Sequence, residues 1–166
     1  MNSSTDPAVF SEHHEAYLNE LNAPESLVSS PSGNFRIRIR RDSQDMGNFF
    51  WNVTHVEVWC IRGNYCMRSF TVNDTRFHYS FQEHDGNEYL IFSEDRFGGQ
   101  SIMNLSNGKY ASYSSGHDDF IWLSHELSAD GQFLSVRGHY FACPQEIKVY
   151  HFDPELRLPL KEAGIW

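Results

Sequence analysis

The sequence lacks the features that send a chain into or across a membrane. No apolar run approaches the roughly 20 residues that span a bilayer. The opening stretch, MNSSTDPAVFSEHHEAYLNE, has neither the basic start nor the apolar core of a secretory signal. Cysteine is also scarce, and an odd count of three argues against a disulfide framework. We therefore expect a cytoplasmic protein with no membrane contact, whose thiols are free and mostly buried.

Familiar catalytic and cofactor motifs are missing as well. The chain contains no GxSxG, Walker A, dinucleotide-binding GxGxxG, CxxC or HExxH pattern. The segment SNGK at residues 106–109 formally matches the SxxK pattern of serine–lysine nucleophiles. It spans an Asn-Gly turn, however, in which the lysine cannot swing back under the serine. We expect no cofactor and no metal, and we favour a protein that is not an enzyme.

Positive charge is in short supply. The chain has 13 Lys and Arg against 22 Asp and Glu, which gives a formal net charge of −9. An acidic chain repels the phosphate backbone, so we expect no nucleic-acid partner.

The first 32 residues hold five acidic residues and no Lys or Arg. Asp6 before Pro7 is typical of a helix start. It is followed by larger side chains at helical spacing, namely Phe10, His14, Tyr17, Leu18 and Leu21. The segment PESLVSSPSGN then has the composition of a linker. We predict an acidic segment over residues 1–32, with a short helix and a linker, and a folded body over residues 33–166.

The body has the period of β-strands. In FRIRIRR, Phe35, Ile37 and Ile39 alternate with arginines, as in a strand with one buried face. Later runs with a high aromatic content flank short turns that supply positive φ angles. These turns are Gly63-Asn64, Asp85-Gly86, Asn107-Gly108 and Asp130-Gly131. The pattern predicts an all-β fold, an antiparallel meander of about ten strands.

A weak repeat lies within this meander. Asp85-Gly86 and Asp130-Gly131 are 45 residues apart, and each precedes an aromatic–leucine pair. SADGQFLSVRG followed by EIKVYHFD resembles the S-x-D-G-x-x-L blade motif of WD40-like β-propeller repeats. The stretch from EYLIFSED to EIKVYHFD is also similar to a mostly bacterial family of unknown function that shares a GGQ…DG…ACP pattern. The resemblance implies blade-like units and supplies no catalytic residues.

The body is long enough for about three such units, and propellers typically close with at least four. A partial propeller, a curled barrel, a sandwich-like sheet, or an edge covered by a second chain all fit this length.

One segment, SADGQFLSVRGHYFACP, gathers candidate site residues. Arg137 and His139 share one face of a predicted strand, and Tyr140 and Cys143 follow at once. Together with Trp122 from the preceding strand, they could line a ligand pocket in a barrel mouth. The competing interpretation is a polar strand face and a loop whose aromatic rings cap the core.

Other polar clusters predict less. His117 beside Asp118 and Asp119, and the pair His13-His14, have no partner motif for a metal site. His125 lies between two leucines on one strand face, which favours a core histidine with satisfied hydrogen bonds.

The arginine stripe Arg36, Arg38, Arg40 and Arg41 indicates either a surface for an acidic partner or a solvated strand face. In the second case the chain's own acidic segment, with Glu12, Glu15 and Glu20, could also dock on it.

These observations favour a binding or assembly module. Aromatic-rich sheet faces or edges, with Trp51, Trp59 and Trp122, would contact a protein partner or another copy in a homo-oligomer. The alternative is a small-molecule binder, or a hydrolase-like enzyme, with its pocket near Arg137 and His139.

Overall fold

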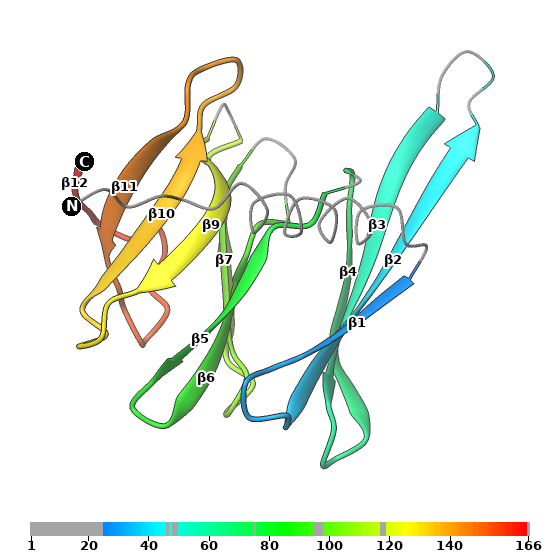
Figure 1. Ribbon diagram of the computed structural model, residues 1–166, viewed down its shortest axis with the longest axis horizontal. Coiled ribbons are helices and arrows are strands. Elements are labelled where there is room, and N and C mark those ends of the chain that lie inside the picture. Colours follow the sequence, from blue (N-terminus) through cyan, green and yellow to red (C-terminus); the bar gives the residue numbers. More distant parts are fainter. Residues whose placement is uncertain are drawn as a thin grey trace, which may run out of the picture.

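The protein is an all-β molecule in the computed structural model, which describes residues 25–45, 47, 50–74, 76–94, 98–116 and 119–165 (Figure 1). These residues contain no helix, and therefore none that could cross a membrane. The strands are β1 (Glu25–Ser29), β2 (Phe35–Asp45), β3 (Phe50–Cys60), β4 (Tyr65–Val72), β5 (Tyr79–His84), β6 (Asn87–Phe92), β7 (Gln100–Asn104), β8 (Tyr110–Tyr113), β9 (Ile121–Leu127), β10 (Phe133–His139), β11 (Glu146–His151) and β12 (Glu162–Ile165).

The strands form three four-stranded sheets, each an antiparallel meander of consecutive strands. We call β1–β4 the first sheet, β5–β8 the second sheet and β9–β12 the third sheet. The predicted turn residues close the hairpins. Asp85 and Gly86 both take positive φ angles, 49° and 71°, in the two-residue turn between β5 and β6. That geometry matches the twist of the strands it joins.

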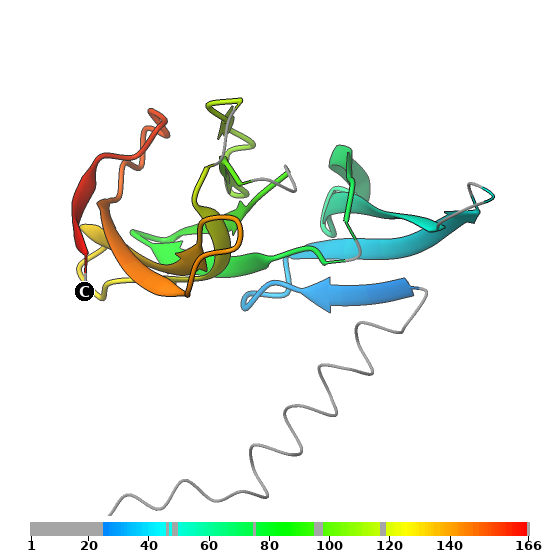
Figure 2. The same ribbon diagram turned by 90° about the horizontal axis from the view of Figure 1, so that it is seen from above.

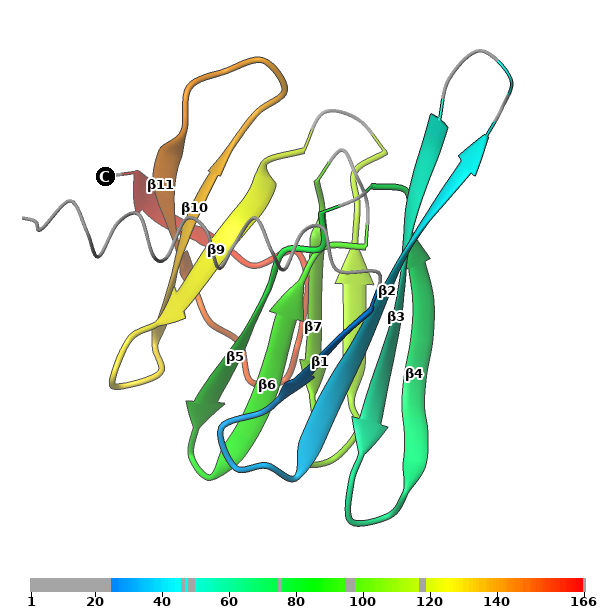
Figure 3. The same ribbon diagram turned by 45° about the vertical axis from the view of Figure 1, so that its right-hand side comes forward.

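The second sheet lies between the other two (Figures 2 and 3). Its central strand β6 shows why, because alternate side chains point to opposite faces and almost all of them are buried. Leu90 and Phe92 enter a core shared with the first sheet, and Tyr89 and Ile91 enter a core shared with the third sheet. The sheets therefore stack face to face, and the outer faces of the first and third sheets stay uncovered by described residues.

A side chain joins the second and third sheets where strand pairing is absent. Gln82 on β5 donates from Nε2 to the carbonyl oxygen of His125, at 3.0 Å. Its Oε1 accepts the backbone N–H of Leu127, also at 3.0 Å. A single amide thus bonds a donor and an acceptor of β9, as a neighbouring strand would.

Two polar links join the first and second sheets. The buried carboxylate of Glu88 accepts the backbone N–H of Ser32, at 3.1 Å, and also its hydroxyl. On the far strands, Arg68 pairs with Glu94 at 3.1 Å and lies 3.4 Å from the ring centre of Tyr110. The first sheet is therefore linked to the second at two separate places, through Glu88 and through Arg68.

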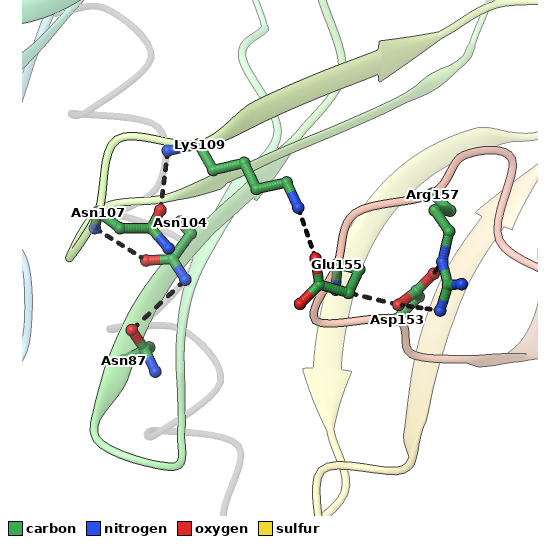
Figure 4. A network of polar contacts seen from close by, with 7 residues as sticks. All are labelled: Asn87, Asn104, Asn107, Lys109, Asp153, Glu155 and Arg157. Atoms are coloured by element: carbon green, nitrogen blue, oxygen red, sulfur yellow. Dashed lines mark hydrogen bonds and ion pairs between the residues drawn. The ribbon is translucent and has the colours of Figure 1, made fainter.

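An exposed network links the β7–β8 turn to the segment after β11 (Figure 4). Asn104 and Asn107 accept backbone N–H groups that shape the turn, which places Lys109 beside the third sheet. Lys109 Nζ then pairs with Glu155 at 2.8 Å, and Asp153 pairs with Arg157 at 2.6 Å.

The predicted all-β class and the antiparallel hairpins are confirmed. There are twelve strands where about ten were predicted, and they form three separate meanders where one was predicted. The linker prediction is wrong at Glu25–Ser29, because these residues pair with β2 as a strand. The predicted N-terminal helix lies outside the described residues. No closed barrel or propeller forms from the three open sheets of the described chain.

The three cysteines are free, as predicted. The prediction that they are mostly buried is wrong, because Cys66 and Cys143 are exposed and Cys60 is half-buried. Cys60 lies opposite Tyr65, and Cys66 lies opposite Trp59, so the two thiols of this hairpin do not face each other.

Candidate functional site

A cavity of about 190 Å³ opens where segments from all three sheets meet. Its walls combine apolar side chains with a few polar groups, which is the usual make-up of a small-molecule site. The lining residues are Val72, Asp74, Arg76, His78, Ser93, Ile121, Trp122, Leu123, His139 and Phe141.

His78 lies just before β5 and is half-buried. Burial lowers its pKa below the ordinary value, and the nearby Arg76 guanidinium lowers it further. The ring also hydrogen-bonds the backbone of Leu123 on the third sheet. His78 is therefore a neutral imidazole at pH 7 and brings hydrogen-bonding capacity to the cavity without charge.

Two of the five predicted site residues line this cavity. Trp122 is almost fully buried, with 1% of its surface exposed, and forms part of a wall. His139 stands at the end of β10, where its Nδ1 is 2.8 Å from the carbonyl oxygen of Tyr140. That oxygen is only an acceptor, so Nδ1 carries the hydrogen and Nε2 is the acceptor of the neutral ring.

Gly138 allows β10 to pass close to β9 just before His139. A Cβ atom on Gly138 would lie 2.1 Å from the carbonyl oxygen of Ile121 and 2.9 Å from the ring of Phe120. Only glycine fits there without a shift, and the β9–β10 register changes at the same point.

The other three predicted site residues lie elsewhere. Arg137 shares a strand face with His139 but is exposed on the outer face of the third sheet and does not line the cavity. Cys143 is exposed in the turn that follows β10. Tyr140 is engaged by a different contact, because its hydroxyl accepts a hydrogen bond from Lys148 Nζ at 3.0 Å.

Lys148 is a buried cation on β11, beside Val136 in the core that the second and third sheets share. Burial alone would lower its pKa, but hydrogen bonds to Tyr140 and Glu162 raise the pKa above its ordinary value. The rings of Phe120 and Tyr140 each lie 5.1 Å from the ammonium nitrogen. The predicted site therefore combines residues from two places in the fold. Trp122 and His139 line the cavity, whereas Tyr140 contacts Lys148.

Asp74, Arg76 and His78 were not among the predicted site residues. They occupy alternate positions that lead into β5, which is the spacing that places side chains on one face of an extended segment. This run of polar residues at a strand start was the available signal. Only the folding of β9 and β10 against it shows that the run meets Trp122 and His139.

His125 is buried, as predicted, but it is not fully satisfied. Its Nδ1 lies 3.1 Å from the hydroxyl of Ser80, while its buried Nε2 has no hydrogen-bond partner among the described residues. His117, Asp118 and the pair His13-His14 lie outside the described residues. No group of three or more potential metal ligands occurs in the described part of the chain.

The outer face of the first sheet carries a second hollow, of about 360 Å³. Leu27 and Ile61 are exposed there, 58% and 39% respectively, and the arginine stripe on β2 runs between Leu27 on β1 and Trp59 on β3. Arg38 pairs with Glu25 at 3.0 Å and with Glu57 at 3.7 Å.

The outer face of the third sheet is also open. Ile147 is 37% exposed, Phe133 contacts His151, and Glu126 is exposed on the adjoining strand.

Comparison of the chain with models of protein families and with curated proteins finds no match. The resemblance to propeller-type repeats and to a mostly bacterial family therefore stays a prediction from the sequence.

Proposed function

We propose that the chain is a non-catalytic assembly module in which the first sheet of one copy stacks against the third sheet of another. One observation carries this proposal. Each face of the second sheet is covered by a neighbouring sheet, and no described residue covers the two outermost faces of the stack, which carry apolar side chains.

The two open faces are chemically suited to each other. Leu27 and Ile61 on one face and Ile147 on the other supply apolar area that water covers poorly. Each face also carries a charge that forms no ion pair with another described residue, Arg36 on the first sheet and Glu126 on the third.

The strand count supports the same arrangement. Each sheet is a four-stranded meander, as a propeller blade is, and blades normally cover each other's faces around a ring. Three blade-like sheets do not complete a ring, so two copies stacked head to tail would provide six. Contacts of this kind between unlike faces close only if the rotation returns to the start.

Light scattering after size-exclusion chromatography tests the proposal. We expect a molar mass above that of the monomer, rising with protein concentration. Leu27→Glu on the first sheet and Ile147→Glu on the third should each lower that mass, since each places a charge in both copies of the contact. Tyr113→Glu, an exposed position on the edge of the second sheet, is the matched control and should leave the mass unchanged.

Mixing the two variants sharpens the test. A closed head-to-tail pair of one Leu27→Glu chain and one Ile147→Glu chain has one contact with neither substitution. The mixture should therefore regain part of the mass that each variant loses alone. A monomer at every concentration, or an equal loss in the Tyr113→Glu control, would overturn the proposal.

A further inference from the structure

We infer that the cavity between the sheets is a binding site for a small aromatic monocarboxylate, with Arg76 as the residue that recognises the carboxylate. None of the lining residues belongs to the hollow on the first sheet, and His139 stands at the end of β10 on the same strand face as Arg137. The cavity also differs from the predicted pocket, in which Arg137 held the corresponding role.

The volume sets the size of the ligand. A cavity of about 190 Å³ suits a small ligand, such as a single aromatic ring with one substituent. Nucleotides and peptides of several residues are too large to enter whole.

The walls favour an aromatic body. Trp122 is buried against the cavity, and Val72, Ile121 and Leu123 add aliphatic surface. Flat rings pack well on such walls. Phe141 completes the rim and is 65% exposed, which is unusual for so large an apolar side chain. The next residue, Ala142, has φ 59°, a left-handed conformation that alanine seldom adopts outside functional loops.

Charge selects a single carboxylate. The Arg76 guanidinium forms no ion pair with another described residue, whereas the Asp74 carboxylate accepts the backbone N–H of Arg76 at 3.2 Å. A planar guanidinium binds a carboxylate through two parallel hydrogen bonds. Asp74 keeps the total charge of this pair near zero, and the neutral His78 adds none, so a dianion such as a phosphate monoester would be poorly compensated.

Isothermal titration of the full chain with benzoate tests the inference, with benzamide as the neutral analogue and phenyl phosphate as the dianion. We expect saturable binding of benzoate, with benzamide and phenyl phosphate at least tenfold weaker. Arg76→Ala should weaken benzoate at least tenfold and leave benzamide unchanged. Arg137→Ala, which removes an exposed arginine outside the cavity, is the matched control and should bind benzoate as the natural chain does.

Phe141→Ser provides a second variant at an exposed position, where a failure to fold is not expected. It should weaken benzoate and benzamide alike, because it removes contact with the ring and not with the carboxylate. Absence of saturable benzoate binding, undiminished binding by Arg76→Ala, or an equal loss in Arg137→Ala would overturn the inference. None of these results depends on the molar mass of the protein, so this site and the proposed assembly can fail separately.

Discussion

Gln82 donates a hydrogen bond to the carbonyl oxygen of His125 across 3.0 Å and thereby joins the first strands of two separate sheets. The same side chain accepts the N–H of Leu127, so both polar ends of one amide are used. Strands β5 and β9 approach each other without forming a ladder, and this amide satisfies backbone groups that would otherwise face a packed interface.

Replacing Gln82 with Leu should therefore destabilise the fold. The change keeps the size of the side chain but leaves a carbonyl and an N–H of β9 unpaired, at a cost of about 2 kcal/mol in the free energy of unfolding. Urea denaturation followed by tryptophan fluorescence measures it. Gln132→Leu, at an exposed position, is the control and should change the free energy by less than about 0.5 kcal/mol. Equal effects would contradict the role given to Gln82.

The stability of the protein should fall as the pH drops below about 6.5. Burial lowers the pKa of His125 to about 3, and the neighbouring His78 contributes to the shift. The unfolded chain therefore takes up a proton between pH 6.5 and 3 that the folded chain does not, and the free energy of unfolding decreases by at most about 1.4 kcal/mol per pH unit for this group.

Denaturation at pH 5, 6 and 7 checks this pH dependence. His125→Gln should show a shallower slope than the natural chain, although His78, whose pKa is also lowered, keeps part of it. A natural-chain slope in His125→Gln would show that this ring does not cause the effect.

Glu88 should be the most sensitive carboxylate of the fold. Only 6% of its surface is exposed, and it accepts hydrogen bonds from the hydroxyl of Ser30, at 3.2 Å, and from Ser32. Glu88→Ala removes a charged acceptor and leaves these donors unpaired, which should cost about 2 to 3 kcal/mol. Glu83→Ala, on the strand opposite and exposed, should cost much less in the same urea titration.

The Lys109–Glu155 ion pair should contribute little, despite its short distance. The two side chains are 46% and 69% exposed, so solvent and salt screen the attraction. Glu155→Gln should change the melting temperature by no more than about 2 °C. A larger drop would mean that this contact holds the second and third sheets together.

The strand pattern was predictable because it depends on residues that are close together in the sequence. The alternation of Phe35, Ile37 and Ile39 with arginines and the Asp85-Gly86 turn each act within a few residues, and both appear in the structure as predicted. The strand β1 was missed because Ser and Pro around Leu27 indicate a linker, whereas pairing with β2 decides its conformation. Strand propensity depends on such neighbours more than helix propensity does.

The candidate site was less predictable, because it depends on contacts between distant segments. His139 and Trp122 were foreseen from their own strands, but the segment that faces them, from Asp74 to His78, lies more than forty residues earlier in the chain. Arg137 was predicted to join them but does not line this cavity, since two residues on one strand face need not reach the same cavity.

The burial of the second sheet on both faces has a consequence for how the protein is made. Residues 79–113 leave the ribosome before strands β9–β12 have been synthesised. At that stage the strands that cover Tyr89 and Ile91 are still missing. A chain that ends near residue 113 would expose this apolar face of the second sheet to solvent. Chaperones would bind it or proteases would degrade it.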